Sequence, residues 1–341
     1  MKFIFDAMGG DNSPFAVVDG VFLYKKNYSD IKFILVGNKE QIESYILEKG
    51  YDKSGVELLN ASGVISCDES PTVSIRERVD SSLVVALDRL KKDDSIDALI
   101  STGSTGAILA GGFLKIGRIK GVSRPSLCPV LPTKKGTNVL IIDSGANADC
   151  KPINLCHFAV MGSIYYRELF GVEKPRVALV NVGTESAKGN ELVKSTYGLM
   201  EKLPINFVGN MEAREALSGD YDVLVCDGFT GNVLIKSVEG AVSLVMGEIK
   251  KAFKSSIKAK LGAMLAMKSL KKLKSKMDYN NHGGSPLLGI KKTVIKSHGS
   301  STAKTICSAI ELAKKYTNSS INEKISDTLL NLPEFGEVEN G

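Results

Sequence analysis

Short runs of apolar, often β-branched residues alternate with longer segments of helical spacing along most of the chain. Runs of this kind, bounded by glycine, proline or polar clusters, are typical of strands buried on both faces of a sheet. We predict strands over residues 2–5, 32–37, 56–59, 98–100, 138–143, 176–181, 205–210, 222–227 and 293–296. Parallel strands need crossover helices, and the intervening segments are long enough to supply them. The pattern therefore predicts an α/β protein with one large, open, mostly parallel sheet and helices on both faces.

The same pattern predicts the domain organisation. The chain has no repeat and no linker that divides it cleanly, so we expect a single α/β domain over residues 1–332. Residues 333–341 are acidic and contain proline and glycine, which predicts a loose C-terminal tail. The polar segment Ser66–Asp80 is expected to be a lid or a solvated surface loop. The proline- and glycine-rich segment 117–133 is expected to cross the fold irregularly.

Small and polar residues follow the predicted strands. The segments concerned are DAMGGDN, STGSTGA, DSGAN, NVGTESAKGN, DGFTGN and HGSS, beginning at residues 6, 101, 143, 181, 227 and 298. Each alone is more typical of turn chemistry, but ligands of open α/β sheets bind at the carboxyl ends of the strands. We therefore predict one cleft lined by Asp6, Gly9, Gly10, Asp143, Asn147, Asn181, Asp227 and Gly231.

The turn after residues 98–100 is the strongest candidate for an anion site. Its glycines allow close approach of backbone, and its hydroxyls precede a segment of helical spacing, whose N-terminus would offer unpaired N–H groups. We predict phosphate binding by Ser101, Thr102, Gly103, Ser104, Thr105 and Gly106. The alternative is an ordinary capped connection between a strand and a helix.

Composition narrows the class of protein. The chain has 341 residues, of which 43% are apolar and 24% charged, and no apolar run is long enough to cross a bilayer. We expect no signal peptide and a cytoplasmic location. The six cysteines include no CxxC pair, and there are three histidines. This favours free thiols over a zinc site. A net charge of +6 is too small to imply nucleic-acid binding.

Several standard site chemistries are missing. No GxGxxG follows a predicted strand, GTESAKGN lacks the GK[ST] ending of a P-loop, and there is no GxSxG elbow. An enzyme without its own nucleophile can instead position that of a substrate. Phosphate is ionised at neutral pH and can attack an activated acyl carbon directly, given positioning and charge compensation.

The strand-end motifs, together with KGNE, Lys236, YNNHGG (Tyr279–Gly284) and HGSS, closely resemble the phosphate acyltransferases of the PlsX type over residues 2–316. Thr102 and Ser104 depart from the usual second motif, which has Ala and Asn there. The resemblance implies a catalytic domain similar to isocitrate/isopropylmalate dehydrogenases and phosphotransacetylases, usually homodimeric. It implies reversible transfer of a long-chain acyl group from acyl-[acyl carrier protein] to phosphate, without a cofactor. The acyl phosphate would feed a membrane glycerol-3-phosphate acyltransferase in bacterial phospholipid synthesis.

The resemblance also suggests roles for individual residues. Lys188 and Asn232 stand where the family places presumed active-site residues. We expect Lys188 to supply charge to phosphate and Asn232 to donate to the thioester oxygen; the alternatives are a solvated lysine and a helix cap. His298 is a candidate acid for the departing thiolate, or a structural histidine. Asp6, Asp143 and Asp227 could together hold magnesium, but capping is the preferred interpretation and no metal is predicted.

Residues 249–278 form a basic amphipathic segment. Ten lysines and no acidic residue occur between residues 250 and 277, and apolar residues recur at helical spacing. We expect Gly262 to divide the run into two helices. The residues predicted to dock are Lys254, Lys258, Leu261, Met264, Leu265 and Lys268. An anionic membrane surface is the preferred partner, which implies peripheral membrane association. Acyl carrier protein, or a second copy of the chain packed on the segment, is the alternative.

Three other functions remain as alternatives. A phosphotransacetylase-like enzyme would consume short acyl-CoA esters. A dehydrogenase of similar fold would require nicotinamide. A non-catalytic membrane scaffold for lipid enzymes would bind liposomes but release no carrier thiol.

Overall fold

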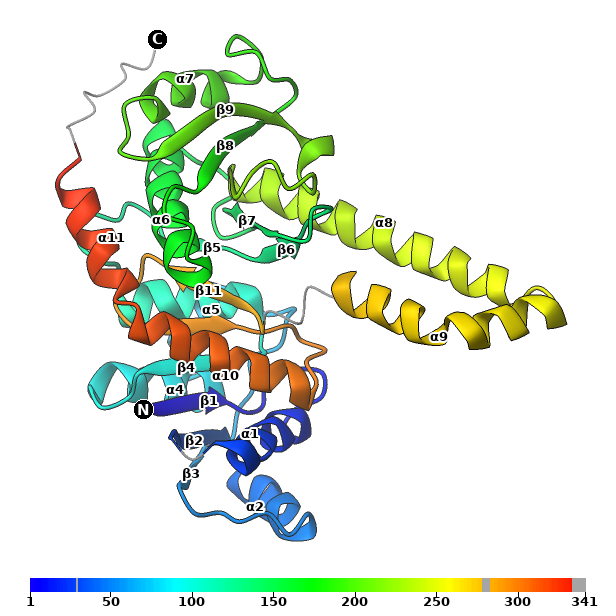
Figure 1. Ribbon diagram of the computed structural model, residues 1–341. Coiled ribbons are helices and arrows are strands. Elements are labelled where there is room, and N and C mark those ends of the chain that lie inside the picture. Colours follow the sequence, from blue (N-terminus) through cyan, green and yellow to red (C-terminus); the bar gives the residue numbers. More distant parts are fainter. Residues whose placement is uncertain (29, 278–282, 333–341) are drawn as a thin grey trace.

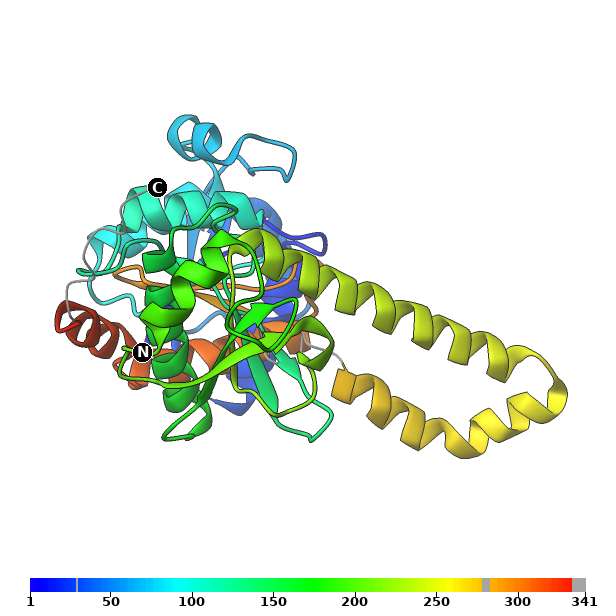
Figure 2. The same ribbon diagram turned by 90° about the horizontal axis from the view of Figure 1, so that it is seen from above.

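Two β-sheets with flanking helices form the body of the molecule, and a pair of helices projects from it (Figures 1 and 2). The computed structural model describes residues 1–28, 30–277 and 283–332, with the side chains of 272–277 excepted. The predicted tail at 333–341 and most of the YNNHGG motif therefore lie outside the described residues. The α/β class is confirmed, but the prediction of one large sheet is wrong.

The first sheet has seven strands. Their spatial order is β3 (Val56–Asn60), β2 (Lys32–Gly37), β1 (Lys2–Asp6), β4 (Ala98–Ser101), β12 (Thr293–Lys296), β11 (Ser285–Leu288) and β5 (Ser126–Leu127). All neighbouring pairs are parallel apart from those of β11, which runs antiparallel to both β12 and β5. The carboxyl ends of β1, β4 and β12 consequently meet at one edge.

The second sheet has five strands. Their spatial order is β6 (Val130–Pro132), β7 (Asn138–Ile142), β10 (Val223–Val225), β8 (Arg176–Asn181) and β9 (Asn206–Glu212). Only β6 is antiparallel to its neighbour. The segment predicted to cross the fold irregularly contains β5 and β6, and the chain passes from one sheet to the other between them. Strands of two and three residues around a proline give no periodic pattern, so the sequence did not reveal them.

Helices cover both faces of each sheet because successive strand side chains point to opposite sides. In the first sheet, Phe3 and Phe5 pack in one core while Ile4 packs in another. The first core lies under α1 (Phe15–Asn27), α2 (Lys39–Glu48) and α10 (Ala303–Asn318). The second lies under α3 (Pro71–Glu77), α4 (Ser82–Lys92), α5 (Thr105–Gly111) and the π-helical turn η1 (Gly112–Ile116).

The second sheet follows the same rule. Leu140 and Ile142 pack on one face, and Val139 and Ile141 pack on the other. The first face is covered by α6 (Pro152–Phe170), α7 (Glu191–Met200) and α11 (Ile321–Leu330). The second face meets the 3-10 turn η2 (Ala213–Glu215) region and the start of α8 (Gly228–Lys254).

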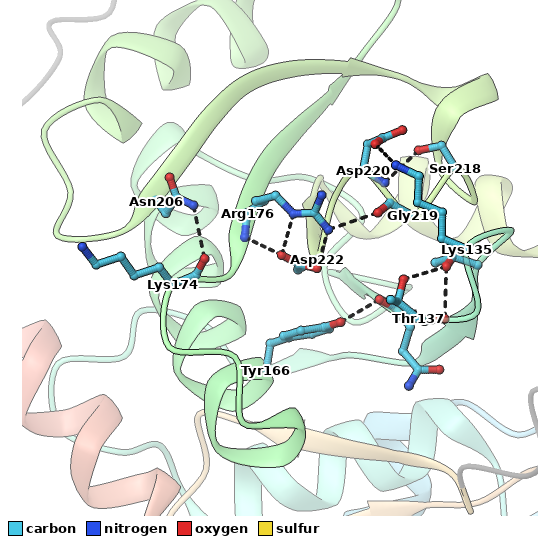
Figure 3. A network of polar contacts seen from close by, with 12 residues as sticks. Lys135, Thr137, Tyr166, Lys174, Arg176, Asn206, Ser218, Gly219, Asp220 and Asp222 are labelled. Atoms are coloured by element: carbon cyan, nitrogen blue, oxygen red, sulfur yellow. Dashed lines mark hydrogen bonds and ion pairs between the residues drawn. The ribbon is translucent and has the colours of Figure 1, made fainter.

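A network of hydrogen bonds and ion pairs lies at the edge of the second sheet where its parallel strands begin (Figure 3). The Arg176 guanidinium donates to both carboxylate oxygens of Asp222 at 2.9 Å, and the Arg176 backbone N–H donates at 2.8 Å. The Tyr166 hydroxyl donates to the carbonyl of Asn138 at 2.7 Å. These contacts join the beginnings of β7, β8 and β10, at the edge opposite to their carboxyl ends.

Helices α8 and α9 (Ile257–Met277) form the projecting hairpin, which stands clear of the body in both views (Figures 1 and 2). In α8 only Gly228, Gly231 and Ile235 are buried, so the helix leaves the body after its second turn. The expected break at Gly262 is wrong. The chain turns at Ser255 and Ser256 instead, where serine hydroxyls bond the ends of the two helices. A glycine inside a helix lowers its stability by about 1 kcal/mol, which is too little to end it.

The segment predicted as a lid or loop contains α3, which packs against α5. All six cysteines are free thiols, as predicted. Among the helices of the described residues, none combines the length and the apolar character needed to span a membrane.

Candidate functional site

Asp6 ties together the strand ends of the first sheet. Its buried carboxylate accepts hydrogen bonds from the hydroxyls of Ser82 at 2.6 Å and Ser101 at 2.7 Å. Burial raises the pKa of Asp6, and these two hydrogen bonds oppose that shift. The Ser101 hydroxyl also accepts from the backbone N–H of Gly103 at 3.1 Å. Asp6 and Ser101 therefore fix the shape of the 101–103 turn.

Two of the glycines predicted to line the cleft, Gly9 and Gly10, lie directly against this turn. A Cβ on Gly9 would lie 2.6 Å from the Cα of Gly103, and one on Gly10 would lie 2.5 Å from the Oγ1 of Thr102. No larger residue fits these positions unless the backbone moves. The 9–12 loop also meets the end of β12, because the Asp11 N–H donates to the carbonyl of Gly299 at 2.9 Å.

Gly9, Gly10 and Gly103 form a layer of closely packed glycine backbone, and the Thr102 hydroxyl is buried within it. Thr102 is 4% exposed, and its Oγ1 has no hydrogen-bond partner among the described residues. A buried hydroxyl without a partner costs about 1–3 kcal/mol, which a bound ligand oxygen can recover.

The other residues of the predicted phosphate-binding turn differ in exposure and in their contacts. The Ser104 hydroxyl caps α5 by accepting from the N–H of Ala107 at 3.5 Å, as the alternative interpretation proposed. Thr105 is exposed. A Cβ on Gly106 would lie 2.6 Å from Pro71 at the start of α3, so the Ser66–Asp80 segment packs over this turn.

Asp143 organises the corresponding edge of the second sheet. Its buried carboxylate accepts six hydrogen bonds, from Ser126, Leu127, Ser144, Ala146 and, twice, Asn147. Ser126 and Leu127 belong to the first sheet, so Asp143 also fastens the two sheets together. Asn147 in turn donates to the carbonyl of Pro125 at 2.8 Å. Both residues thereby shape the loop, with their polar atoms directed inward.

The start of α8 packs on this loop. Asp227 caps the helix by accepting from the N–H and the hydroxyl of Thr230, both at 2.8 Å. A Cβ on Gly231 would lie 1.9 Å from the carbonyl oxygen of Asp143. Asn232 is exposed, and its Cβ and Cγ lie 3.7 Å from the Cβ position of Gly145. The cap is Asp227, so the alternative role of Asn232 as the helix cap is wrong.

Lys188 lies in the loop that follows β8, and Asn181 is the last residue of that strand. Asn181 shapes this loop by donating to the carbonyl of Lys188 at 3.0 Å. The Lys188 ammonium pairs with Glu185 at 2.8 Å, and this contact raises the pKa of Lys188. Half of the lysine side chain is exposed. The structure therefore places Lys188 at the same sheet edge as Asn232, held by a carboxylate of its own loop.

Electrostatic coupling connects the two sheet edges. Burial lowers the pKa of His298. The positive charges of Lys296, in β12, and of Lys236, in α8, lower this pKa further, and the negative charge of Glu239, in α8, opposes the shift. The His298 ring contacts the Ser300 hydroxyl at 2.8 Å. The first turns of α8 thus face the residues that follow β12.

Lys296 is a candidate that the sequence analysis missed. It ends β12 opposite Ser101, and burial lowers the pKa of Lys296 to about 8, with Asp11 and Asp6 among the charges that oppose the shift. Its ammonium donates to the carbonyl of Ser297. The sequence signal for Lys296 is its place two residues before the HGSS motif, which begins at His298.

The three aspartates proposed as a possible magnesium site are separated. Asp6 ends a strand of the first sheet, while Asp143 and Asp227 follow strands of the second, and the carboxylate of each accepts hydrogen bonds from other residues. In the part of the chain that the structure describes, no group of three metal-ligating side chains could hold an ion.

Comparison with known proteins identifies the family. The model of the family described as "Fatty acid synthesis protein" matches residues 1–324. A phosphate acyltransferase from Alkaliphilus oremlandii is 47% identical over 332 residues, 97% of this chain and 98% of that protein. One from Clostridioides difficile is 47% identical over 326 residues, 96% of this chain and 95% of that protein.

Solved structures share the fold at low sequence identity. A phosphotransacetylase from Streptococcus pyogenes superposes with a TM-score of 0.59 at 15% identity, covering 95% of this chain and 94% of that one. A branched-chain phosphotransacylase from Enterococcus faecalis gives 0.58 at 13% identity, covering 94% and 100%. With the near-full-length relatives, the resemblance of the strand-end motifs is confirmed: the chain belongs to the phosphate acyltransferase family, a family of acyltransferase enzymes.

Proposed function

We propose that the protein transfers a long-chain acyl group from the thioester of acyl-[acyl carrier protein] to inorganic phosphate. The phosphate oxygen attacks the thioester carbonyl, the carbon–sulfur bond breaks, and the products are an acyl phosphate and the free carrier thiol. The reaction is reversible and needs no cofactor. The observation that supports it most directly is the unpartnered, buried Thr102 hydroxyl within a layer of glycine backbone. Such a layer suits a small oxyanion and leaves little space for a larger side chain.

The raised pKa values of two cysteines near the loops of the second sheet support direct attack of phosphate on the thioester. Burial raises the pKa of Cys150 to about 12, and burial also raises the pKa of Cys226 well above its ordinary value. The thiolate is the nucleophilic form of cysteine, so these two thiols are poorly suited to forming an acyl-enzyme. Phosphate supplies the nucleophile instead.

The charged and polar residues around the two edges have distinct proposed roles. Lys188 and Lys296 compensate the charge of phosphate and of the developing oxyanion. Asn232, at the exposed start of α8, donates to the thioester oxygen. His298 donates a proton to the departing thiolate. The lowered pKa of His298 makes its protonated ring a stronger acid, but leaves a smaller protonated fraction at neutral pH.

The α8–α9 hairpin is the proposed docking element. Leu261, Met264 and Leu265 are 58%, 70% and 92% exposed, and the described side chains of Lys254, Lys258 and Lys268 are exposed beside them. Apolar side chains projecting with lysines suit an anionic membrane surface. The protein would then be cytoplasmic and peripherally bound, as a homodimer. There it would pass acyl phosphate to a membrane glycerol-3-phosphate acyltransferase.

The docking proposal can be tested separately from catalysis. Leu261→Glu combined with Leu265→Glu should abolish co-sedimentation with anionic liposomes while turnover of soluble substrate is retained. Leu47→Glu, at a 75% exposed position on α2, is the matched control. If the double variant still sediments with liposomes, the hairpin is not the membrane contact. If it sediments less but also loses turnover with acyl carrier protein, the same surface binds the carrier.

The catalytic proposal is tested with palmitoyl-[acyl carrier protein], with and without phosphate. Phosphate-dependent release of carrier thiol, with formation of acyl phosphate in equal amount, is the expected result. The fold shared with phosphotransacetylases favours one competing function, the use of short acyl-CoA esters. Turnover of acetyl-CoA but not of the palmitoyl carrier would establish that function. Liposome binding without any thiol release would indicate a scaffold.

A further inference from the structure

A cavity of about 530 Å³ lies between α1, α6 and α10. This volume falls within the range of small-molecule sites, roughly 300–1,000 Å³. Its walls combine apolar and aromatic side chains with lysine and glutamate of α10. The lining used in the argument is Leu23, Tyr24, Tyr165, Leu169, Phe170 and Leu312.

One end of the cavity reaches the backbone of the proposed active site. Gly284 and Lys304 are both lining residues of the cavity. A Cβ on Gly284 would lie 2.3 Å from the carbonyl oxygen of Lys296, so cavity and site share one layer of backbone there. Lys304 belongs to the first turn of α10, which follows the HGSS segment directly.

The cavity extends along α10 from Lys304 to Lys315. At 1.5 Å per residue this is about 16 Å. One leaflet of fatty chains covers half of the roughly 30 Å hydrocarbon core of a bilayer, about 15 Å. Tyr24 and Tyr165 form a buried part of the wall, whereas Leu23 is 43% exposed at its rim. The length, the apolar lining and the contact of Gly284 with the Lys296 backbone all suit an extended hydrocarbon chain.

We propose that this cavity holds the fatty chain of the acyl donor, with the thioester at the Gly284 and Lys304 end. The proposal rests on the proposed function, because it names where the long-chain part of that substrate binds. It also gives the enzyme a physical means of preferring long chains, since each methylene placed in the cavity leaves water.

The test uses Leu23→Trp, whose ring would occupy the rim of the cavity. Leu23 lies beside Tyr24, which interacts with Glu311, so it is about 10 Å along α10 from the Lys304 end. Palmitoyl donors should lose about tenfold or more in kcat/KM, the loss expected when two methylenes are kept out of an apolar site. Octanoyl donors should change less than twofold. Leu47→Trp on α2 is the control and should change neither.

A binding measurement separates this proposal from the catalytic one. The chain has no tryptophan, so each variant has a single indole fluorophore. Brominated palmitate should quench the residue at position 23 but not the one at position 47. Quenching without phosphate-dependent turnover would support the cavity and overturn the proposed function. Turnover with no quenching, and with equal loss for both chain lengths, would overturn the cavity proposal. A change of oligomeric state in Leu23→Trp, measured by light scattering, would also overturn it, by identifying this face as a contact between copies of the chain.

Discussion

Gly231 of α8 and the backbone of Asp143 are packed so closely that a Cβ at position 231 would lie 1.9 Å from the Asp143 carbonyl oxygen. The Asp143 carboxylate is meanwhile held by six hydrogen bonds, so neither its loop nor the start of α8 can yield easily. This contact fixes where Asn232 stands. The position of the proposed oxygen donor therefore depends on the absence of one methyl group beside it.

We expect Gly231→Ala to lower the free energy of unfolding by about 1–3 kcal/mol, the usual range for overpacking, and to lower kcat as Asn232 moves. Thermal denaturation and steady-state kinetics measure both. Gly240→Ala in the same helix is the control, because nothing lies within 4 Å of its Cβ position. It should match or exceed wild-type stability, since alanine favours helices. An unaltered kcat in Gly231→Ala would show that Asn232 does not depend on this contact.

Asn232→Ala should reduce kcat about a hundredfold to a thousandfold if its amide donates to the developing oxyanion. Stability should change little, because Asn232 is exposed and Asp227 is the helix cap. Asn206→Ala is a matched control at the opposite edge, where the amide donates to the carbonyl of Lys174. Full turnover in Asn232→Ala would remove the proposed role.

Lys188→Met should raise KM for phosphate and lower kcat while leaving unfolding almost unchanged. The pair of Lys188 with Glu185 is half-exposed, and surface pairs contribute about 0–1 kcal/mol. Lys135→Met removes a similar surface pair with Asp220 at the other edge of the sheet and should leave the kinetics unaltered. Equal kinetics in both variants would assign Lys188 to loop structure alone.

Lys296 should give phosphate binding a distinctive pH dependence. Because the folded pKa of Lys296 is about 8, its positive charge is lost as pH rises through 8, and KM for phosphate should rise there. Lys296→Arg should move that rise to higher pH, and Lys296→Met should raise KM below pH 8 and abolish the rise at pH 8. A wild-type KM that stays constant across pH 8 in the same buffers would contradict the role.

The same shift has a consequence for stability. Between the folded pKa of about 8 and the ordinary value of 10.5, the unfolded chain binds more protons at this lysine than the folded chain. The contribution of Lys296 to the free energy of unfolding therefore rises with pH across that window. Comparing urea denaturation of wild type and Lys296→Met between these pH values isolates this contribution.

Arg176→Met should lower the free energy of unfolding without changing the kinetics of the folded enzyme. Asp222 is 5% exposed and would lose its charged partner, so we expect unfolding to become easier by about 1.5–3 kcal/mol. The pair lies at the starting edge of the second sheet (Figure 3), so kcat/KM per folded molecule should be unchanged at low temperature. A selective loss of kcat would mean that the two edges of the sheet are coupled.

The sequence by itself determined the α/β class, nine strands, the strand-end motifs and the family. These are local features: a buried strand needs a continuous apolar run, and backbone that passes close to other backbone needs glycine, as at Gly9 and Gly10. The motif DSGAN could be located from the sequence, but only the structure shows that the carboxylate of its aspartate, Asp143, is buried and bonded to neighbouring protein groups.

Only the tertiary structure decided how these parts are divided and brought together. The separation into two sheets depends on β5, β6 and β11, whose pairing is long-range and whose apolar runs are too short to give a period. The environment of Lys296 comes from Asp6, Asp11 and α8, which are distant from it in sequence. The cavity along α10 likewise needs α1 and α6 beside it. Burial and charge at such places are set by neighbours that local periodicity does not specify.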